Sequence, residues 1–181
     1  MRIIGGSLKG RIINPVDLNI RPTTDFAKEA LFNILSNNYP FETLHVLDLF
    51  GGSGSISFEF ASRGAPHITC VEMKAHNALF IKKTAIQLKL NSIQVIQQNV
   101  FDFITHCTQK YHLIFADPPF QLPLLASLPE RMETSRLLHP NGIFILEHSG
   151  SFDFKSVHGF RSVRKYGNVH FSFFCFDAQP K

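Results

Sequence analysis

The 181-residue sequence has few cysteines, no long apolar run and no internal repeat. Its three cysteines, Cys70, Cys107 and Cys175, are odd in number and widely spaced, which argues against a disulfide framework and against a zinc site. No stretch approaches the length of a membrane span, and the first residues lack the apolar core of a signal peptide. These absences predict a reduced, cytoplasmic protein that does not enter a membrane.

Metal-ligand spacing is also missing. The nine histidines are scattered, without a pair at metal-ligand spacing flanked by Cys, Asp or Glu, so we predict no metal site.

The length of the chain suits one domain and is short for two, and no low-complexity tract or linker divides it. We expect a single domain over residues 1–181, with a basic N-terminal hairpin or extension over 1–24 and the core over 25–181. We also expect a monomer.

The net charge of +4 is unevenly distributed. Residues 1–28 hold five Lys and Arg against two acids, and residues 151–181 again hold five against two, whereas the middle of the chain is slightly acidic. Two basic ends are consistent with contacts to a phosphate backbone. An ordinary solvated surface would have the same composition, so charge alone leaves nucleic acid binding open.

Short apolar runs alternate with helical patterns from residue 44 onward. We predict strands at 45–50, 67–71, 92–97, 111–116 and 143–147, and helices at 25–35, 55–63, 74–90, 101–107 and 124–138. Such alternation predicts a parallel sheet with helices on both faces, which binds ligands at the carboxyl ends of its strands. Two later strands, 157–165 and 169–176, are joined at a glycine turn and predict an appended antiparallel hairpin.

The motif Asp117-Pro118-Pro119-Phe120 directly follows the apolar run 111–116. Two prolines remove two backbone N–H donors, so this stretch accepts hydrogen bonds only, through its carbonyls and the Asp117 carboxylate. Such a pocket suits an amino group, and Phe120 offers a face on which a nucleobase can stack. The alternative is a proline-capped strand end without chemistry.

A second motif follows the first strand of the predicted sheet. Asp48-Leu49-Phe50 passes into Gly51-Gly52-Ser53-Gly54, and a helix then begins. Glycines let a ligand approach the backbone, and a helix N-terminus favours an anionic group. The next strand ends in Glu72, where an acid in this type of fold binds ribose hydroxyls. Ser57 occupies the place of a further glycine, which weakens a dinucleotide fingerprint. A tight turn and a strand cap are the structural alternative.

Together these motifs resemble the class I S-adenosylmethionine-dependent methyltransferases, and more narrowly the RsmD-type small-subunit (16S) ribosomal RNA guanine-N2 methyltransferases. The resemblance extends over nearly the whole chain, including Met1-Arg2-Ile3-Ile4-Gly5-Gly6, Arg21-Pro22-Thr23-Thr24-Asp25 and Lys165-Tyr166-Gly167. It implies a Rossmann-like fold with a seven-stranded, mostly parallel sheet, an antiparallel C-terminal strand and a small N-terminal β-hairpin. The chain departs from the family at Gly51, usually Ala, and at Lys28, usually Arg.

The resemblance also implies roles for named residues. Asp117, Pro118, Pro119 and Phe120 would be catalytic. S-adenosylmethionine would contact Asp48, Phe50, Gly52, Ser53, Gly54, Glu72, Asn99 and Val100. The candidates for contact with ribosomal RNA or the small ribosomal subunit are Arg2, Lys9, Arg11, Arg21, Thr23 and Thr24, joined by Lys165, Arg161 and Arg164 if the C-terminal hairpin faces the same side. The turn at 21–24 could equally cap the helix that follows.

Other functions use the same acceptor-only pocket. DNA adenine-N6 or cytosine-N4 methylation is one, although no second domain for reading a DNA sequence is evident. Methylation of a protein side-chain amide is another. A ribosome-assembly protein that binds cofactor or RNA without catalysis is the third, and the intact 117–120 motif argues against it.

Overall fold

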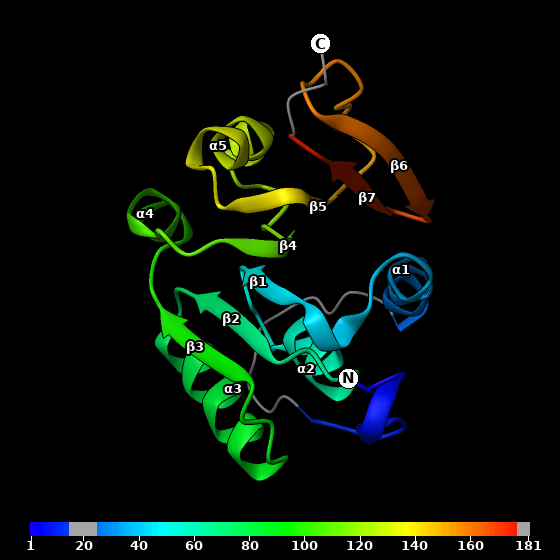
Figure 1. The fold of residues 1–181 in the computed structure, drawn as a ribbon, viewed down its shortest axis with the longest axis vertical. Helices are drawn as coiled ribbons and strands as arrows, with labels where there is room; N and C mark the ends of the chain where they lie inside the picture. The colour runs from blue at the N-terminus through cyan, green and yellow to red at the C-terminus, as the bar shows by residue number, and fades with distance from the viewer. Residues whose placement is uncertain (15–24, 177–181) are drawn as a thin grey trace.

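One seven-stranded sheet forms the centre of the computed structural model, which describes residues 1–14 and 25–176 (Figure 1). The strands are β1 (His45–Leu49), β2 (His67–Glu72), β3 (Ile93–Gln97), β4 (Tyr111–Ala116), β5 (Leu138–His148), β6 (Phe160–Tyr166) and β7 (Val169–Phe174). Their order is β3-β2-β1-β4-β5-β7-β6. The five strands β1, β2, β3, β4 and β5 all run parallel to one another, and β7 is antiparallel to both of its neighbours, β5 and β6. The predicted mostly parallel sheet is confirmed.

Helices cover both faces of this sheet. The helices are α1 (Asp25–Asn38), α2 (Ser55–Ser62), α3 (Ala75–Gln87), α4 (Val100–His106) and α5 (Leu128–Ser135). Figure 1 shows α1, α2 and α3 on one side of the sheet and α4 and α5 on the other. Adjacent residues of β1 point to opposite faces. Val46 packs in the same cluster as Leu31 of α1, whereas Leu47 packs in the same cluster as Phe103 of α4. None of the helices within the described ranges is long and apolar enough to cross a bilayer.

The N-terminal ribbon, residues 1–14, pairs as predicted but is less regular than a hairpin of two strands. Arg2 and Ile12 form a single antiparallel bridge, and a short 3-10 helix, η1 (Gly6–Leu8), lies between them. The Ile3 N–H donates to the Arg11 carbonyl at 2.9 Å. Ile3 is buried beside α2 and α3, so the ribbon is packed onto the helical face rather than projecting from it.

The predicted helix at 124–138 is wrong in its extent. A 3-10 turn, η3 (Leu125–Ser127), comes first, and α5 begins only at Leu128 with Pro129 in its first turn. The N–H groups of the first turn of a helix have no partner within the helix. Proline, which has no N–H, is therefore favoured at this position. Arg136, with a φ of 54°, ends the helix.

The strand predicted at 143–147 begins five residues earlier, at Leu138. Pro140 and Gly142 both weaken the hydrogen bonding of a strand, so the local sequence does not indicate a strand in this stretch. In the structure β5 pairs with β4 at Leu138 and again from Ile143, with a shift of register between the two points. The irregularity accommodates both residues. Another short 3-10 turn, η2 (Phe41–Thr43), precedes β1.

Candidate active site

A glycine-rich loop joins β1 to α2 at the carboxyl edge of the sheet, where the parallel strands end. Gly52 and Gly54 have φ values of 55° and 78°, in the region that favours glycine. The Gly54 N–H donates to the Gly51 carbonyl at 2.7 Å, and the Gly51 N–H donates to the Val71 carbonyl of β2 at 2.9 Å. Ser53 is buried in the turn. The loop therefore presents the N-terminus of α2 at this edge, where an anionic group is stabilised.

Glu72, the last residue of β2, fastens this loop. Its Oε2 accepts from the Gly52 N–H at 2.8 Å, and its Oε1 accepts from the Lys74 N–H at 2.7 Å. The residue is only 7% exposed. Each carboxylate oxygen has a further lone pair, so the group can hold the loop and still accept from the two hydroxyls of a ribose.

Asp48 lies beneath the loop and is buried. Its Oδ2 accepts from the Ser57 hydroxyl at 2.5 Å and from the Ser57 N–H at 3.1 Å. Burial raises the pKa of the Asp48 carboxyl to about 7, against the lowering effect of the two hydrogen bonds from Ser57. The position of Asp48 links β1 to the first turn of α2, so this carboxyl supports the loop from within.

Replacing Asp48 by asparagine should change how stability depends on pH. A carboxyl with a raised folded-state pKa contributes stability below its unfolded pKa, and this contribution is lost as the pH rises through about 7. Between pH 4.5 and pH 8 the free energy of unfolding of Asp48→Asn should therefore gain about 3–4 kcal/mol relative to the unmodified protein. Urea unfolding at both pH values measures this difference, and a constant difference would contradict the raised pKa.

Asn99 caps α4 and lies beside the same edge. Its Oδ1 accepts from the Phe101 N–H at 2.8 Å, and its Nδ2 lies 3.8 Å from the Met73 sulfur. Val100 is buried, and the Phe50 ring meets Phe101 edge-on with 6.4 Å between centroids. One lone pair of the Asn99 oxygen is thus used as a helix cap. The predicted contact of Asn99 with adenine stays a prediction.

The 117–120 motif leaves the end of β4 next to the glycine loop. Leu49 and Ala116, the last residues of β1 and β4, are paired, and the Asp117 N–H donates to the Leu49 carbonyl at 3.4 Å. Pro118 is buried, Asp117 and Phe120 are half-buried and Pro119 is exposed. The two motifs found in the sequence therefore share one edge on adjacent strands.

The predicted RNA-contacting residues fall into three groups. Arg2, Lys9 and Arg11 are exposed on the N-terminal ribbon, and Arg2 forms an ion pair with Asp25 at 3.7 Å. Lys165, Arg161 and Arg164 are exposed on β6. Arg21, Thr23 and Thr24 lie outside the described residues.

A family model described as Conserved hypothetical protein 95 matches residues 1–175. The chain belongs to this family. Ribosomal RNA small subunit methyltransferase D of Buchnera aphidicola subsp. Baizongia pistaciae is 32% identical over 154 residues, which cover 84% of this chain and 78% of that protein. The protein of the same name from Escherichia coli K12 is 35% identical over 143 residues, covering 78% and 68%. The family resemblance predicted from the motifs is confirmed.

Solved structures share the fold. The protein yhhF from Escherichia coli is 28% identical and superimposes with a TM-score of 0.84 over 99% of both chains. SMU.776, crystallised with SAH, has a TM-score of 0.64 at 16% identity and covers 84% of this chain and 50% of its own, which shows likeness of fold alone. The family member described here thus has the class I methyltransferase fold.

A buried ion cluster beneath the ribbon was missed by the sequence analysis. Glu59 of α2 accepts from the N–H groups of Ile4 and Gly5 at 2.8 Å each, and pairs with Arg63 at 2.9 Å and Lys28 at 3.8 Å. Desolvation lowers the pKa of the buried Lys28, and the charge of Glu59 opposes this. The spacing of Glu59 and Arg63, four residues apart on a helix, was the one local signal. The bonds to Ile4 and Gly5 join distant parts of the chain and had none.

Four histidines form a row across the amino edge of the sheet. His67, His45, His112 and His139 follow one another on adjacent strands, with 4.6, 5.4 and 4.4 Å between successive ring centroids. The His45 N–H donates to the His112 Nδ1 at 3.0 Å. Burial and the neighbouring imidazoles lower the pKa of His45 and His112. Over residues 1–14 and 25–176, no group of three His, Cys, Asp or Glu side chains is arranged to hold a metal ion.

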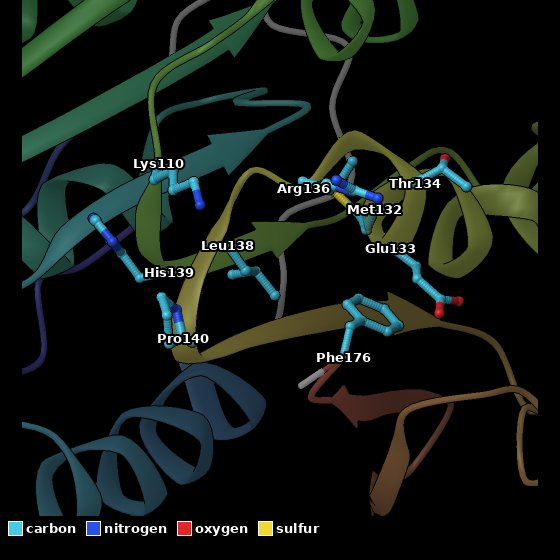
Figure 2. A pocket seen from close by; sticks show the side chains of 10 residues that line it. Lys110, Met132, Glu133, Thr134, Arg136, Leu138, His139, Pro140 and Phe176 are labelled. Carbon is cyan, nitrogen blue, oxygen red and sulfur yellow. The ribbon is translucent and has the colours of Figure 1, made fainter. Parts of the chain in front are cut away.

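A surface hollow of about 600 Å³ opens near the same amino edge (Figure 2). Lys110, Arg136, His139 and Phe176 are among its lining residues. The lining includes neither the glycine loop nor the 117–120 motif, so this hollow is not the candidate active site.

Proposed function

We propose that this protein is an S-adenosylmethionine-dependent methyltransferase acting on the exocyclic N2 amino group of a guanine in small-subunit ribosomal RNA. The observation that carries the proposal is the placement of the 117–120 motif beside the glycine loop on paired strands. The family, whose members include proteins named ribosomal RNA small subunit methyltransferase D, supports ribosomal RNA as the substrate class.

The residues of the carboxyl edge fit the proposed cofactor. Gly52 and Gly54 leave the backbone open to a ligand, and the N-terminus of α2 favours a carboxylate there. Glu72 has oxygen lone pairs for the ribose hydroxyls, and Asn99 and Val100 at the start of α4 would contact the adenine. When bound, S-adenosylmethionine supplies an electrophilic methyl group on a sulfonium.

The acceptor-only motif would position the amine. The Asp117 carboxylate and the Pro118 carbonyl would each accept a hydrogen bond from one N–H of the amino group. This arrangement would direct the nitrogen lone pair toward the methyl-donor side of the site. Phe120 would stack on the base. Because orientation alone can supply about 7–11 kcal/mol of barrier reduction, no covalent enzyme intermediate is needed. A paired base hides its amino group, so the target must be unpaired or flipped out.

Radiolabelled cofactor tests this function. The protein is incubated with unmodified ribosomal RNA, unmodified small subunits or duplex DNA, and the product is digested to nucleosides. We expect label in N2-methylguanosine from RNA or subunits. Label in N6-methyladenosine, or in DNA, would contradict the guanine assignment, and cofactor binding without any transfer would favour a non-catalytic assembly protein.

Neutralising the N-terminal ribbon should weaken RNA binding in a salt-dependent manner. In the variant Arg2→Gln/Lys9→Gln/Arg11→Gln, the slope of log affinity against log salt should decrease in magnitude by up to about 2–3, since each lost phosphate contact removes about 0.7–0.9. Fluorescence anisotropy between low and high salt measures the slope.

Three exposed lysines on α3 and just after it provide a matched control. Lys82→Gln/Lys83→Gln/Lys89→Gln removes the same charge from another part of the surface and should leave the slope nearly unchanged. Equal slopes for the ribbon variant and the unmodified protein would show that the ribbon does not contact phosphate.

A further inference from the structure

A large aromatic side chain is exposed near the carboxyl edge. Phe26, in the first turn of α1, is 69% exposed. Its ring meets Tyr166, at the end of β6, in an edge-to-face arrangement with 5.9 Å between centroids and an angle of 79°. Figure 1 shows the turn between β6 and β7 beside α1. Single exposed apolar side chains are common in proteins, so it is the contact of Phe26 with a second ring that distinguishes this position and makes it suited to stacking.

The Tyr166 ring is held from below. It packs against Phe171 of β7 at 5.9 Å, and Phe171 packs against Phe115 of β4 at 6.3 Å. A continuous line of rings thus runs from the surface to β4, the strand that Asp117 follows. Such packing fixes the orientation of Tyr166 before any ligand binds, which lowers the entropy lost on binding.

The sheet register places this pair near the proposed reaction centre. Ala116 of β4, Leu146 of β5, Ser172 of β7 and Val163 of β6 lie in one row. Tyr166 is three residues beyond that row and Asp117 is one beyond it, on strands that run in the same direction. With about 4.8 Å between strands and 3.3 Å per residue, the separation is on the order of 15 Å. A short run of unpaired nucleotides spans that distance.

Arg164 places a positive charge beside the aromatic pair. It is exposed and two residues from Tyr166, so the side chains of Arg164 and Tyr166 leave β6 on the same face, whereas Lys165 leaves on the other. The nearest acid in sequence, Asp25, is paired with Arg2 at 3.7 Å. Exposed rings with cations beside them are the arrangement that binds single-stranded nucleic acid, in which bases stack and phosphates pair with basic side chains.

We propose that Phe26 and Tyr166 form a stacking platform for an unpaired base that flanks the target nucleotide, with Arg164 contacting an adjoining phosphate. This inference rests on the proposed function, because it assumes an RNA strand that enters the carboxyl edge. The platform holds the strand on one side while Phe120 receives the target base. It therefore contributes to substrate affinity and not to the transfer step.

Steady-state kinetics of Phe26→Ala test the platform. Loss of one stacked base should raise the KM for RNA by about 5- to 100-fold, with kcat and cofactor affinity within twofold of the unmodified protein. Phe26→Trp should restore the KM, whereas Phe26→Leu, apolar but without a ring, should not. Ile86→Ala on α3, where Ile86 is 77% exposed, is the control for removing an exposed apolar side chain. An unchanged KM in Phe26→Ala, or full rescue by leucine, overturns the platform.

Photocrosslinking separates this inference from the proposed function. A ribosomal RNA transcript containing 5-iodouridine is irradiated with the protein, and crosslinked peptides are identified by mass spectrometry. Crosslinks to Phe26 or Tyr166 support the platform. Methyl transfer by the unmodified protein without such crosslinks, and with a normal KM in Phe26→Ala, overturns the platform but leaves the function standing. Absence of methyl transfer to any RNA overturns the function, and the crosslinks then decide the platform alone.

Discussion

Replacing Asp117 by alanine should lower kcat for methyl transfer by at least about 100-fold, because the amine loses the acceptor that orients its lone pair. Asp117 lies at the end of β4 and its backbone N–H is bonded to Leu49, so the strand end itself should remain in place. The affinity for S-adenosylmethionine should change by no more than about threefold, since the proposed cofactor contacts lie on β1, β2 and α4. Single-turnover transfer and calorimetric cofactor binding measure the two effects separately.

Two further variants make the result specific. Asp117→Asn keeps the size of the side chain and one carbonyl acceptor but loses the charge, so it should retain more activity than the alanine variant. Asp102→Asn, at an exposed position on α4, should keep normal activity. Full transfer by Asp117→Ala would refute the role assigned to the carboxylate.

Replacing Glu72 by alanine should weaken cofactor affinity by about 10- to 100-fold. The carboxylate is proposed to accept from the ribose, and a hydrogen bond to a charged group contributes about 1.5–3 kcal/mol. The substitution also removes the acceptor for the Gly52 and Lys74 N–H groups, so the glycine loop loses its attachment to β2. Isothermal titration calorimetry with S-adenosylmethionine gives the affinity, and thermal unfolding gives the structural cost.

A second pair of variants separates these two contributions. Glu72→Gln retains one carbonyl acceptor and should show a smaller loss of affinity than the alanine variant. Glu130→Ala, an exposed position on α5 across the sheet, should bind the cofactor normally. Unchanged affinity in Glu72→Ala would remove this residue from the ribose site.

The candidate site was predictable because its parts follow strands. In a parallel sheet the carboxyl ends of neighbouring strands meet at one edge, so the order of residues along the chain already places the glycine loop after β1, Glu72 at the end of β2 and Asp117 after β4 close together. Local patterns sufficed because each of these groups is positioned by the strand that precedes it. The roles of these residues remain predictions until the variants are measured.

Features that depend on distant partners could not be predicted in the same way. The burial of Lys28 depends on Glu59 and on the ribbon, and the start of β5 at Leu138 depends on its pairing with Tyr111. Pro140 and Gly142 have local preferences against a strand, and the shift of register between Leu138 and Ile143 leaves both outside the pairs with β4. The exposure of Phe26 was equally unpredictable, because its spacing in α1 is that of a core residue.

The attachment of the ribbon to α2 imposes an order on synthesis and folding. Ile4 and Gly5 are bonded to Glu59, and the Leu8 N–H donates to the Ser62 hydroxyl at 2.9 Å. These partners are translated long after the ribbon itself, and closing so long a loop costs entropy that local structure cannot repay. The ribbon is therefore made before the partners that hold it, and a chain halted before α2 is complete would carry the ribbon undocked.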